Sequence, residues 1–210
     1  MKHPYIAIEG PIGSGKSTLA QLLAQHFDSN LLLEQAADNP FLPLFYRDMS
    51  RHALATQMFF LFQRINQLSR LRQPDLFARR TVTDYILEKD RLFARLTLDD
   101  NEFALYTQLY DHLSPQAPKP DLVIYLQASV DVLLARIHRR ARAMERGISR
   151  DYLLRLSESY MQFFYNYHDA PLLIVNNDRL NFAEERTHFD ILLQRIERMK
   201  SAREYFNLAS

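Results

Sequence analysis

The sequence contains no cysteine, which excludes disulfide bonds, thiolate metal sites and a cysteine nucleophile. No apolar run approaches the ~18 residues that a membrane-spanning helix needs, and the first residues lead directly into a candidate strand without the apolar core of a secretion signal. Neither sign of charge dominates, because 26 basic and 25 acidic side chains give a formal net charge of +1. This balance argues against a dedicated nucleic-acid binder. We expect a cytoplasmic protein that needs no membrane.

Glycine is also scarce, and three of the four glycines lie within residues 10–15. The string GPIGSGKS at residues 10–17 matches the pattern of a phosphate-binding loop, between an apolar run and a helical repeat of leucines. Backbone without a Cβ can wrap around an anion and direct several N–H groups at it. The pattern predicts that Lys16 reaches the β- and γ-phosphates of a nucleotide and that the Ser17 hydroxyl binds Mg²⁺.

Apolar runs alternate with helical periodicities along the chain. The expected strands are residues 5–8, 30–33, 81–83, 122–126 and 172–175. The expected helices are one directly after the phosphate loop and residues 53–71, 87–96, 99–113, 130–143, 152–167 and 182–200. This alternation predicts an α/β fold, with a five-stranded parallel sheet flanked by helices in a single domain of residues 1–210.

Two acidic residues follow expected strands, and ligands of a parallel sheet bind at the carboxyl ends of its strands. Glu34 follows the second strand and Asp84 follows the third. A kinase that acts on an alcohol needs a carboxylate near the attacking hydroxyl, whereas many phosphate-loop enzymes use an aspartate to hold Mg²⁺. The residues alone leave open which acid is the base, so Asp84 is either an alternative base or part of the magnesium shell.

An arginine-rich segment at residues 136–150 is the feature that best separates kinases from other phosphate-loop proteins. Its arginines are Arg136, Arg139, Arg140, Arg142, Arg146 and Arg150. Guanidinium groups favour planar, bidentate contacts with phosphate, so we interpret this segment as a lid that closes over a transferring phosphoryl group. The alternatives are a solvated basic helix face or a patch that binds nucleic acid.

Taken together, these features resemble the deoxynucleoside kinases over nearly the whole chain. The resemblance depends on the loop GPIGSGKS, on Glu34 with the downstream string DNPFLPLFY, on Gln57 and Arg64 seven residues apart, and on the lid sequence RIHRRARAMERGI. It implies a kinase fold with ATP or another nucleoside triphosphate and Mg²⁺ as cofactors. It also implies a homodimer formed through long helices.

The resemblance assigns roles to particular residues. Glu34 is the general base for the 5′-hydroxyl. Residues at the substrate are Tyr46 and Glu145 at the 3′-hydroxyl, Gln57 at the base edge, Arg64 beside base and sugar, and Asp90 near the base. Residues at ATP are Gly10, Pro11, Ile12, Gly13, Ser14, Gly15, Lys16, Ser17, Thr18, Arg136, Arg140 and Arg142. Independently of the resemblance, Phe59, Phe60 and Phe62 on the long helix are interpreted first as core residues, and stacking of one of them on the nucleobase is the alternative.

The sequence departs from the family at one position. Relatives usually carry an acid-Arg-Ser triplet after the third strand, whereas this chain has Asp84, Tyr85 and Ile86. The arginine expected near the catalytic centre is therefore absent. We consider Arg79, Arg80 and Arg91 as residues that compensate for it.

The resulting prediction is phosphorylation of a deoxynucleoside at its 5′-hydroxyl, with purine deoxynucleosides weakly favoured by analogy. One alternative is a nucleoside monophosphate kinase similar to thymidylate kinase, which needs no base and leaves Glu34 without a role. The other is a phosphate-loop ATPase or switch module, for which the lid arginines have no role.

Overall fold

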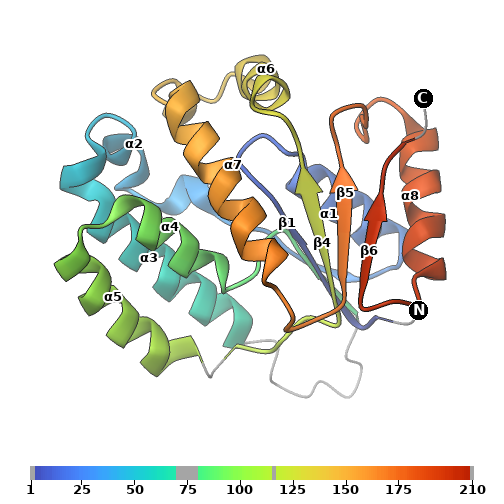
Figure 1. Cartoon of the computed structure of the whole chain (residues 1–210), viewed down its shortest axis with the longest axis horizontal. Helices are drawn as coiled ribbons and strands as arrows, with labels where there is room; N and C mark the ends of the chain where they lie inside the picture. Colours follow the sequence, from blue (N-terminus) through green and yellow to red (C-terminus); the bar gives the residue numbers. More distant parts are fainter. Residues whose placement is uncertain (1–2, 70–79, 115–116, 209–210) are drawn as a thin grey trace.

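The computed structural model describes residues 3–69, 80–114 and 117–208, and it contains a parallel sheet covered by helices on both sides (Figure 1). The strands are β1 (Tyr5–Glu9), β2 (Asn30–Leu32), β3 (Thr81–Thr83), β4 (Leu122–Gln127), β5 (Leu172–Asn176) and β6 (Arg203–Phe206). Their order is β2-β3-β1-β4-β5-β6, and every neighbouring pair is parallel. The predicted α/β class is confirmed.

The sheet has six strands, so the prediction of five was wrong by one. The additional strand, β6, pairs with β5 at the edge of the sheet. Its sequence REYF is short, and none of its four residues is buried. A strand exposed at an edge lacks the continuous apolar run by which buried parallel strands are recognised, which explains why the pattern was missed.

The α-helices are α1 (Lys16–His26), α2 (Leu42–Phe45), α3 (Met49–Ser69), α4 (Lys89–Thr97), α5 (Asp100–Leu113), α6 (Val130–Arg140), α7 (Arg150–Tyr165) and α8 (Arg186–Arg198). Short 3₁₀ turns lie at Ala36–Asp38 and Ala143–Glu145. The expected long helix ran to residue 71, which lies outside the described residues. Helix α6 ends at Arg140 rather than near residue 143, because Ala141 adopts a left-handed conformation with φ of 51°.

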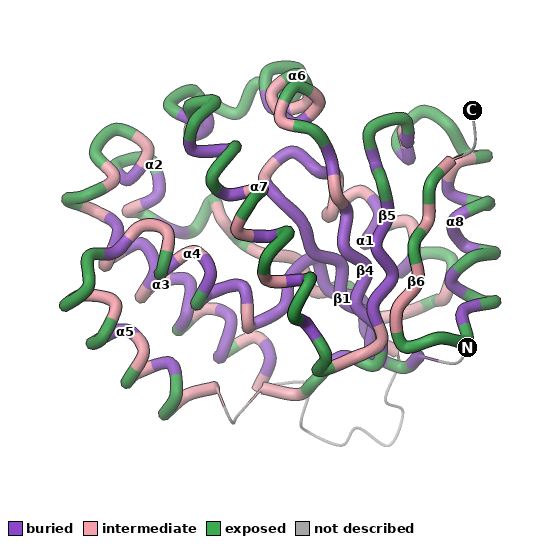
Figure 2. The backbone as a smooth tube through the Cα atoms, viewed as in Figure 1, coloured by how far each residue is buried: buried purple, intermediate pink, exposed green. Residues whose placement is uncertain are grey.

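Successive residues of each strand point to opposite faces, and each face has its own core. From β1, Tyr5 and Ala7 belong to the cluster that packs on α3, α4, α5 and α7. Ile6 and Ile8 belong to the cluster that packs on α1 and α8. Figure 2 shows the buried residues along the strands and on the inner faces of the helices, with exposed residues on the outward turns.

The carboxyl ends of β1, β2 and β3 meet at one edge of the sheet, where the phosphate loop leads from β1 into α1. Gly13 shows why this loop needs glycine. Its φ is +87°, and a Cβ there would lie 2.8 Å from the backbone oxygen of Leu133 in α6. The loop is therefore packed directly beneath the helix that carries the predicted lid arginines. Within the described residues, no helix is long and apolar enough to span a membrane.

Candidate active site

A cavity of about 820 Å³, counted with its open mouth, lies at the carboxyl ends of the central strands. It joins the phosphate loop to residues of α2, α3, α4 and the lid. The sequence-predicted residues that line it are Ile12, Gly13, Lys16, Ser17, Glu34, Tyr46, Gln57, Arg64, Asp84, Arg140, Arg142 and Glu145. Segments far apart in the sequence thus contribute to one space. Asp90 is not among the lining residues.

Lys16 and Ser17 begin α1 at the floor of the cavity. The Lys16 ammonium donates hydrogen bonds to the carbonyl oxygens of Gly10 and Pro11, at 2.7 and 3.1 Å. Burial lowers the pKa of this ammonium. The Ser17 hydroxyl donates to Asp84 Oδ2 at 2.5 Å. A hydroxyl and a carboxylate therefore meet beside the phosphate loop.

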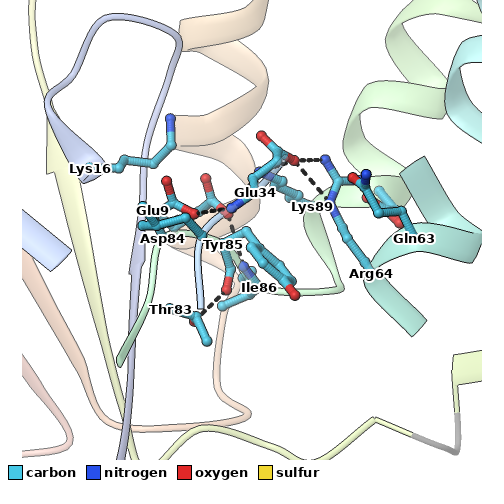
Figure 3. A network of polar contacts seen from close by, with 12 residues as sticks. Glu9, Lys16, Glu34, Gln63, Arg64, Thr83, Asp84, Tyr85, Ile86 and Lys89 are labelled. Atoms are coloured by element: carbon cyan, nitrogen blue, oxygen red, sulfur yellow. Dashed lines mark hydrogen bonds and ion pairs between the residues drawn. The ribbon is translucent and has the colours of Figure 1, made fainter. Parts of the chain in front are cut away.

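Asp84 also contacts the chain after β2, because its Oδ1 accepts a hydrogen bond of 2.7 Å from the backbone N–H of Glu34. The aspartate thereby connects the phosphate loop to the Glu34 backbone and leaves the Glu34 carboxylate free to point elsewhere. In Figure 3 the Glu34 side chain lies between Lys16 and Arg64. The two acids that the sequence singled out are adjacent and have different neighbours.

The Glu34 carboxylate is surrounded by cations. Burial alone would raise its pKa, but Arg64 and then Lys89 and Lys16 hold the pKa well below its usual range. Arg64 Nε donates to Glu34 Oε1 at 3.0 Å, and its terminal nitrogen contacts the same oxygen. Glu34 is therefore ionised at neutral pH, which is the state in which a carboxylate accepts a proton.

Arg64 connects two carboxylates from its position on α3. One terminal nitrogen forms the ion pair with Glu34 and the other forms an ion pair with Asp90. The side chain of Asp90 is completely buried and that of Arg64 is 4% exposed. The guanidinium also lies over the ring of Phe60, 4.7 Å from its centroid. Asp90 thus lies behind Arg64, and its predicted contact with a nucleobase stays a prediction.

Lys89 was not predicted. It lies in the first turn of α4, its side chain is 3% exposed, and its Nζ is 3.1 Å from Glu34 Oε1. It lines the same cavity as the phosphate loop. The sequence gives little signal for it, because adjacent charges at a helix start usually face solvent. Only the packing of α4 against α3 and α7 turns this lysine inward.

Tyr85 occupies the position of the expected arginine, and its ring points away from Lys16 (Figure 3). The side chain is fully buried, and its hydroxyl donates to Gln67 Oε1 on α3 at 2.7 Å. It does not line the cavity. Tyr85 therefore packs α3 against the end of β3 and supplies no cation.

Two of the compensating arginines that we considered lie elsewhere. Arg80 precedes β3, at the opposite end of that strand from Asp84. Arg91 is about half exposed and pairs with Asp111 at 3.6 Å on the outside of α4 and α5. Both suggestions were wrong, because neither side chain lies at the cavity. Arg79 lies outside the described residues.

The lid segment contributes Arg140, Arg142, Met144 and Glu145 to the cavity lining. Arg140 forms a bidentate ion pair with Glu145, with distances of 2.7 and 2.5 Å, and Arg142 lies 3.9 Å from the same carboxylate. A Cβ on Gly147 would lie 2.6 Å from the backbone oxygen of Tyr46. Glycine therefore lets the lid approach α2 closely and brings Glu145 and Tyr46 to one wall.

Arg136 is directed away from the main cavity. Its guanidinium donates to the backbone oxygens of Asn177 and Leu180, both at 2.8 Å. Asn177 in turn donates through its side chain to the backbone oxygen of Ser14. These residues enclose a second hollow of about 540 Å³ beside the loop, together with Gly15, Thr18, Arg139, Arg140 and Phe182 among others. This hollow therefore contains Ser14, Gly15, Thr18 and Arg136, which the sequence analysis assigned to ATP, and it shares Gly13 and Arg140 with the main cavity.

Helix α3 supplies the far wall of the main cavity. Gln57 is 3% exposed and its amide nitrogen donates to Thr97 Oγ1 at 3.4 Å. Of the three neighbouring phenylalanines, Phe60 lines the cavity and Phe62 is 47% exposed. Phe93, which the sequence did not suggest, also lines it from α4.

Comparisons of the sequence with known proteins identify deoxynucleoside kinases. The family model described as deoxynucleoside kinase matches residues 6–200. A deoxyadenosine kinase of Lactobacillus acidophilus is 32% identical over 97% of this chain and 98% of its own. A deoxyguanosine kinase of Bacillus subtilis is 34% identical over 93% of this chain and 97% of its own.

Solved structures agree on the fold. The structure of deoxyadenosine kinase from M. mycoides with bound dCTP has a TM-score of 0.80 and 23% identity, and it covers 93% of this chain and 100% of that one. These findings confirm the predicted resemblance and a nucleoside kinase activity, rather than a thymidylate-kinase-like enzyme or an ATPase module. The chain therefore belongs to the deoxynucleoside kinase family.

Proposed function

We propose that this enzyme transfers the γ-phosphoryl group of ATP to the 5′-hydroxyl of a purine deoxynucleoside. The observation that carries this proposal is the position of Glu34. The carboxylate lies in one cavity with Lys16 of the phosphate loop and with Gln57 and Arg64 of α3. A nucleoside monophosphate kinase needs no such base, because its acceptor is already a phosphate. An ATPase needs no side chains that bind an acceptor.

In the proposed reaction the 5′-oxygen attacks the γ-phosphorus, and its proton passes to the Glu34 carboxylate. The bond between the γ-phosphorus and the β,γ-bridging oxygen breaks, and ADP leaves with the electron pair. Lys16 and the backbone N–H groups of the loop after Pro11 bind the phosphates, while Arg140 and Arg142 neutralise charge from the lid side. Pro11 and Arg136 then hold the loop in shape, since the Pro11 carbonyl accepts a hydrogen bond from Lys16 and Arg136 donates to the Ser14 carbonyl.

The oxygen donors at the phosphate loop suit Mg²⁺. No cluster of three or more His, Asp or Glu side chains that could hold a metal occurs within residues 3–69, 80–114 and 117–208. Mg²⁺ commonly binds through one carboxylate and substrate phosphates, and Ser17 with Asp84, 2.5 Å apart, would supply the protein oxygens. When bound there, the ion would neutralise charge on the phosphates. We therefore propose the magnesium role for Asp84 and the base role for Glu34.

The acceptor is proposed to lie against α3. Gln57 can donate and accept at once, which suits the edge of a nucleobase, and Phe60 offers a ring face. Tyr46 and Glu145 would hold the 3′-hydroxyl. The purine preference follows the relatives whose names specify deoxyadenosine and deoxyguanosine.

The test is ATP consumption with a panel of deoxynucleosides, their monophosphates, and no acceptor. We expect ADP and a 5′-monophosphate to form with deoxyadenosine or deoxyguanosine. Turnover with monophosphates only, or hydrolysis that is independent of the acceptor, would contradict the proposal. A pyrimidine preference would contradict the purine assignment alone.

We also propose that the enzyme is a homodimer. Leu154, Met161 and Tyr165 are exposed by 46, 45 and 76%. Their spacing places them on one face of α7, opposite the residues that α7 buries. Sedimentation of the protein and of a Met161→Asp variant tests this, and an unchanged monomer in both would contradict it.

A further inference from the structure

Lys89 is the one buried cation of the cavity to which neither the sequence nor the family resemblance assigns a role. Its position at the amino end of α4 places the ammonium among Glu34, Glu9 and the ring of Tyr85. Figure 3 shows it beside Glu34, on the side away from the viewer. A buried lysine needs a negative partner, because an unpaired charge in a low-dielectric interior is costly.

Glu9 does not explain this lysine. Its carboxylate at the end of β1 already accepts hydrogen bonds from the N–H groups of Gly10 and Ile86 and from the Tyr160 hydroxyl, at 2.9, 3.1 and 2.9 Å. Lys89 is 3.8 Å from Glu9 and 3.1 Å from Glu34. The shorter contact is with the carboxylate that opens onto the cavity, whose side chain is 20% exposed.

Arg140 and Arg142 also line the cavity, but they belong to the lid, and the other cations that could serve the acceptor side are engaged elsewhere. Tyr85 points away to Gln67, and Arg91 pairs with Asp111 outside. Arg64 is committed to Glu34 and to the buried Asp90. Phosphoryl transfer needs positive charge around the phosphorus and a fixed acceptor oxygen. Lys16 is placed to bind the phosphates of the donor nucleotide, so a second cation is needed beside the acceptor hydroxyl.

We propose that Lys89 is that cation: a positioning residue that holds the Glu34 carboxylate toward the acceptor and supplies the positive charge that relatives supply with an arginine after the third strand. The inference rests on the proposed function of Glu34 as the base. In this proposal a lysine from the following helix takes the place of the arginine that relatives carry after the third strand.

The test compares Lys89→Met, which keeps the apolar stem, Lys89→Gln and Lys89→Arg. Arg91→Gln is the control, since it removes a charge from the exposed side of the same helix. We expect kcat to fall roughly 10²-fold in the Met and Gln variants. KM for ATP and for the nucleoside should change by less than about threefold. Lys89→Arg should retain kcat within about tenfold, and Arg91→Gln should retain all of it.

A second readout does not depend on the acceptor. ADP with aluminium fluoride and Mg²⁺ mimics the phosphoryl group in transfer, and its binding is compared with that of ADP alone by calorimetry. We expect the additional affinity that aluminium fluoride confers to fall at least about tenfold in Lys89→Met, with ADP affinity unchanged. Arg91→Gln should leave both unchanged.

The two proposals fail in different ways. Wild-type protein that phosphorylates no deoxynucleoside overturns the proposed function, while the aluminium fluoride measurement still decides whether Lys89 serves the transfer centre. A kcat within about threefold of wild type in either uncharged variant overturns the role of Lys89. Equal losses in Lys89→Arg and Lys89→Met, with an unaltered aluminium fluoride effect, would show that the lysine only packs α4.

Discussion

The acceptor wall is the group formed by Glu34, Arg64 and Asp90, and the lid is residues 136–150. Both regions carry arginines and carboxylates, but they differ in how far these side chains are buried and how closely they are paired. On the acceptor wall, the Arg64 side chain is 4% exposed and pairs with both Glu34 and Asp90. On the lid, Arg142 is 55% exposed and is 3.9 Å from Glu145. Charges interact more strongly where water is excluded. The ion pairs of Arg64 are thus buried, whereas Arg142 on the lid is largely exposed and only distantly paired, although its neighbour Arg140 forms a bidentate pair with Glu145.

The two regions also differ in whether their charged residues are expected to stabilise the fold or to bind the nucleotide. Loss of one partner from a buried pair leaves an uncompensated charge in the core, whereas exposed pairs contribute little. Substitutions on the wall should therefore affect both folding and chemistry. Substitutions on the lid should affect nucleotide binding and leave folding nearly unchanged.

The largest expected effect is at Glu34. We expect Glu34→Gln to lower kcat about 10³-fold, because the amide cannot accept the 5′-hydroxyl proton. ATP binding, measured separately, should survive. The matched control is Glu197→Gln on the exposed surface of α8. Near-normal turnover in Glu34→Gln would transfer the base role to Asp84.

Arg64→Gln tests the buried wall itself. It leaves Asp90 without its cation, and we expect the free energy of unfolding to fall by about 3 kcal/mol. Denaturant titration measures this change. Arg51→Gln is the control on the exposed side of α3 and should change stability by less than about 0.5 kcal/mol. Equal effects of the two variants would mean that the ion pairs of Arg64 do not stabilise the fold.

The lowered pKa of Glu34 predicts a pH dependence. The folded protein holds this proton more weakly than the unfolded chain, in which the pKa of glutamate is about 4.3. The stabilisation is therefore fully present above that pH, and it is lost as pH falls through the folded-state value. We expect the difference in unfolding free energy between wild type and Glu34→Gln to be constant near neutrality and to shrink below about pH 4. A constant difference would contradict the shift.

The smallest effect is expected on the lid. Arg142→Gln should raise KM for ATP by about tenfold or less and leave the melting temperature unchanged, because its ion pair is long and half exposed. Arg146→Gln, in the same segment but outside the cavity lining, should leave both values unchanged. A loss of thermal stability in Arg142→Gln would show that the lid is as firmly held as the wall.

Much of the fold could be predicted from local patterns. Strands β1 and β4 are continuous apolar runs, and the glycine-rich loop between β1 and α1 is recognisable because few backbones can bind a polyphosphate. Strand β6 could not be predicted in this way, because none of its residues is buried and only pairing with β5 makes them a strand.

Some features of the candidate site could likewise be predicted from local sequence, and others could not. The sequence by itself determined the phosphate loop, the two acids after β2 and β3 and the lid arginines, because each of these depends on residue type and local spacing. Only the tertiary structure decided that Asp84 joins Ser17, that Tyr85 turns away and that Lys89 turns inward. These outcomes depend on which helix faces cover the sheet. A charged residue at a helix start becomes a buried partner of Glu34 only when α4 packs against α3 and α7.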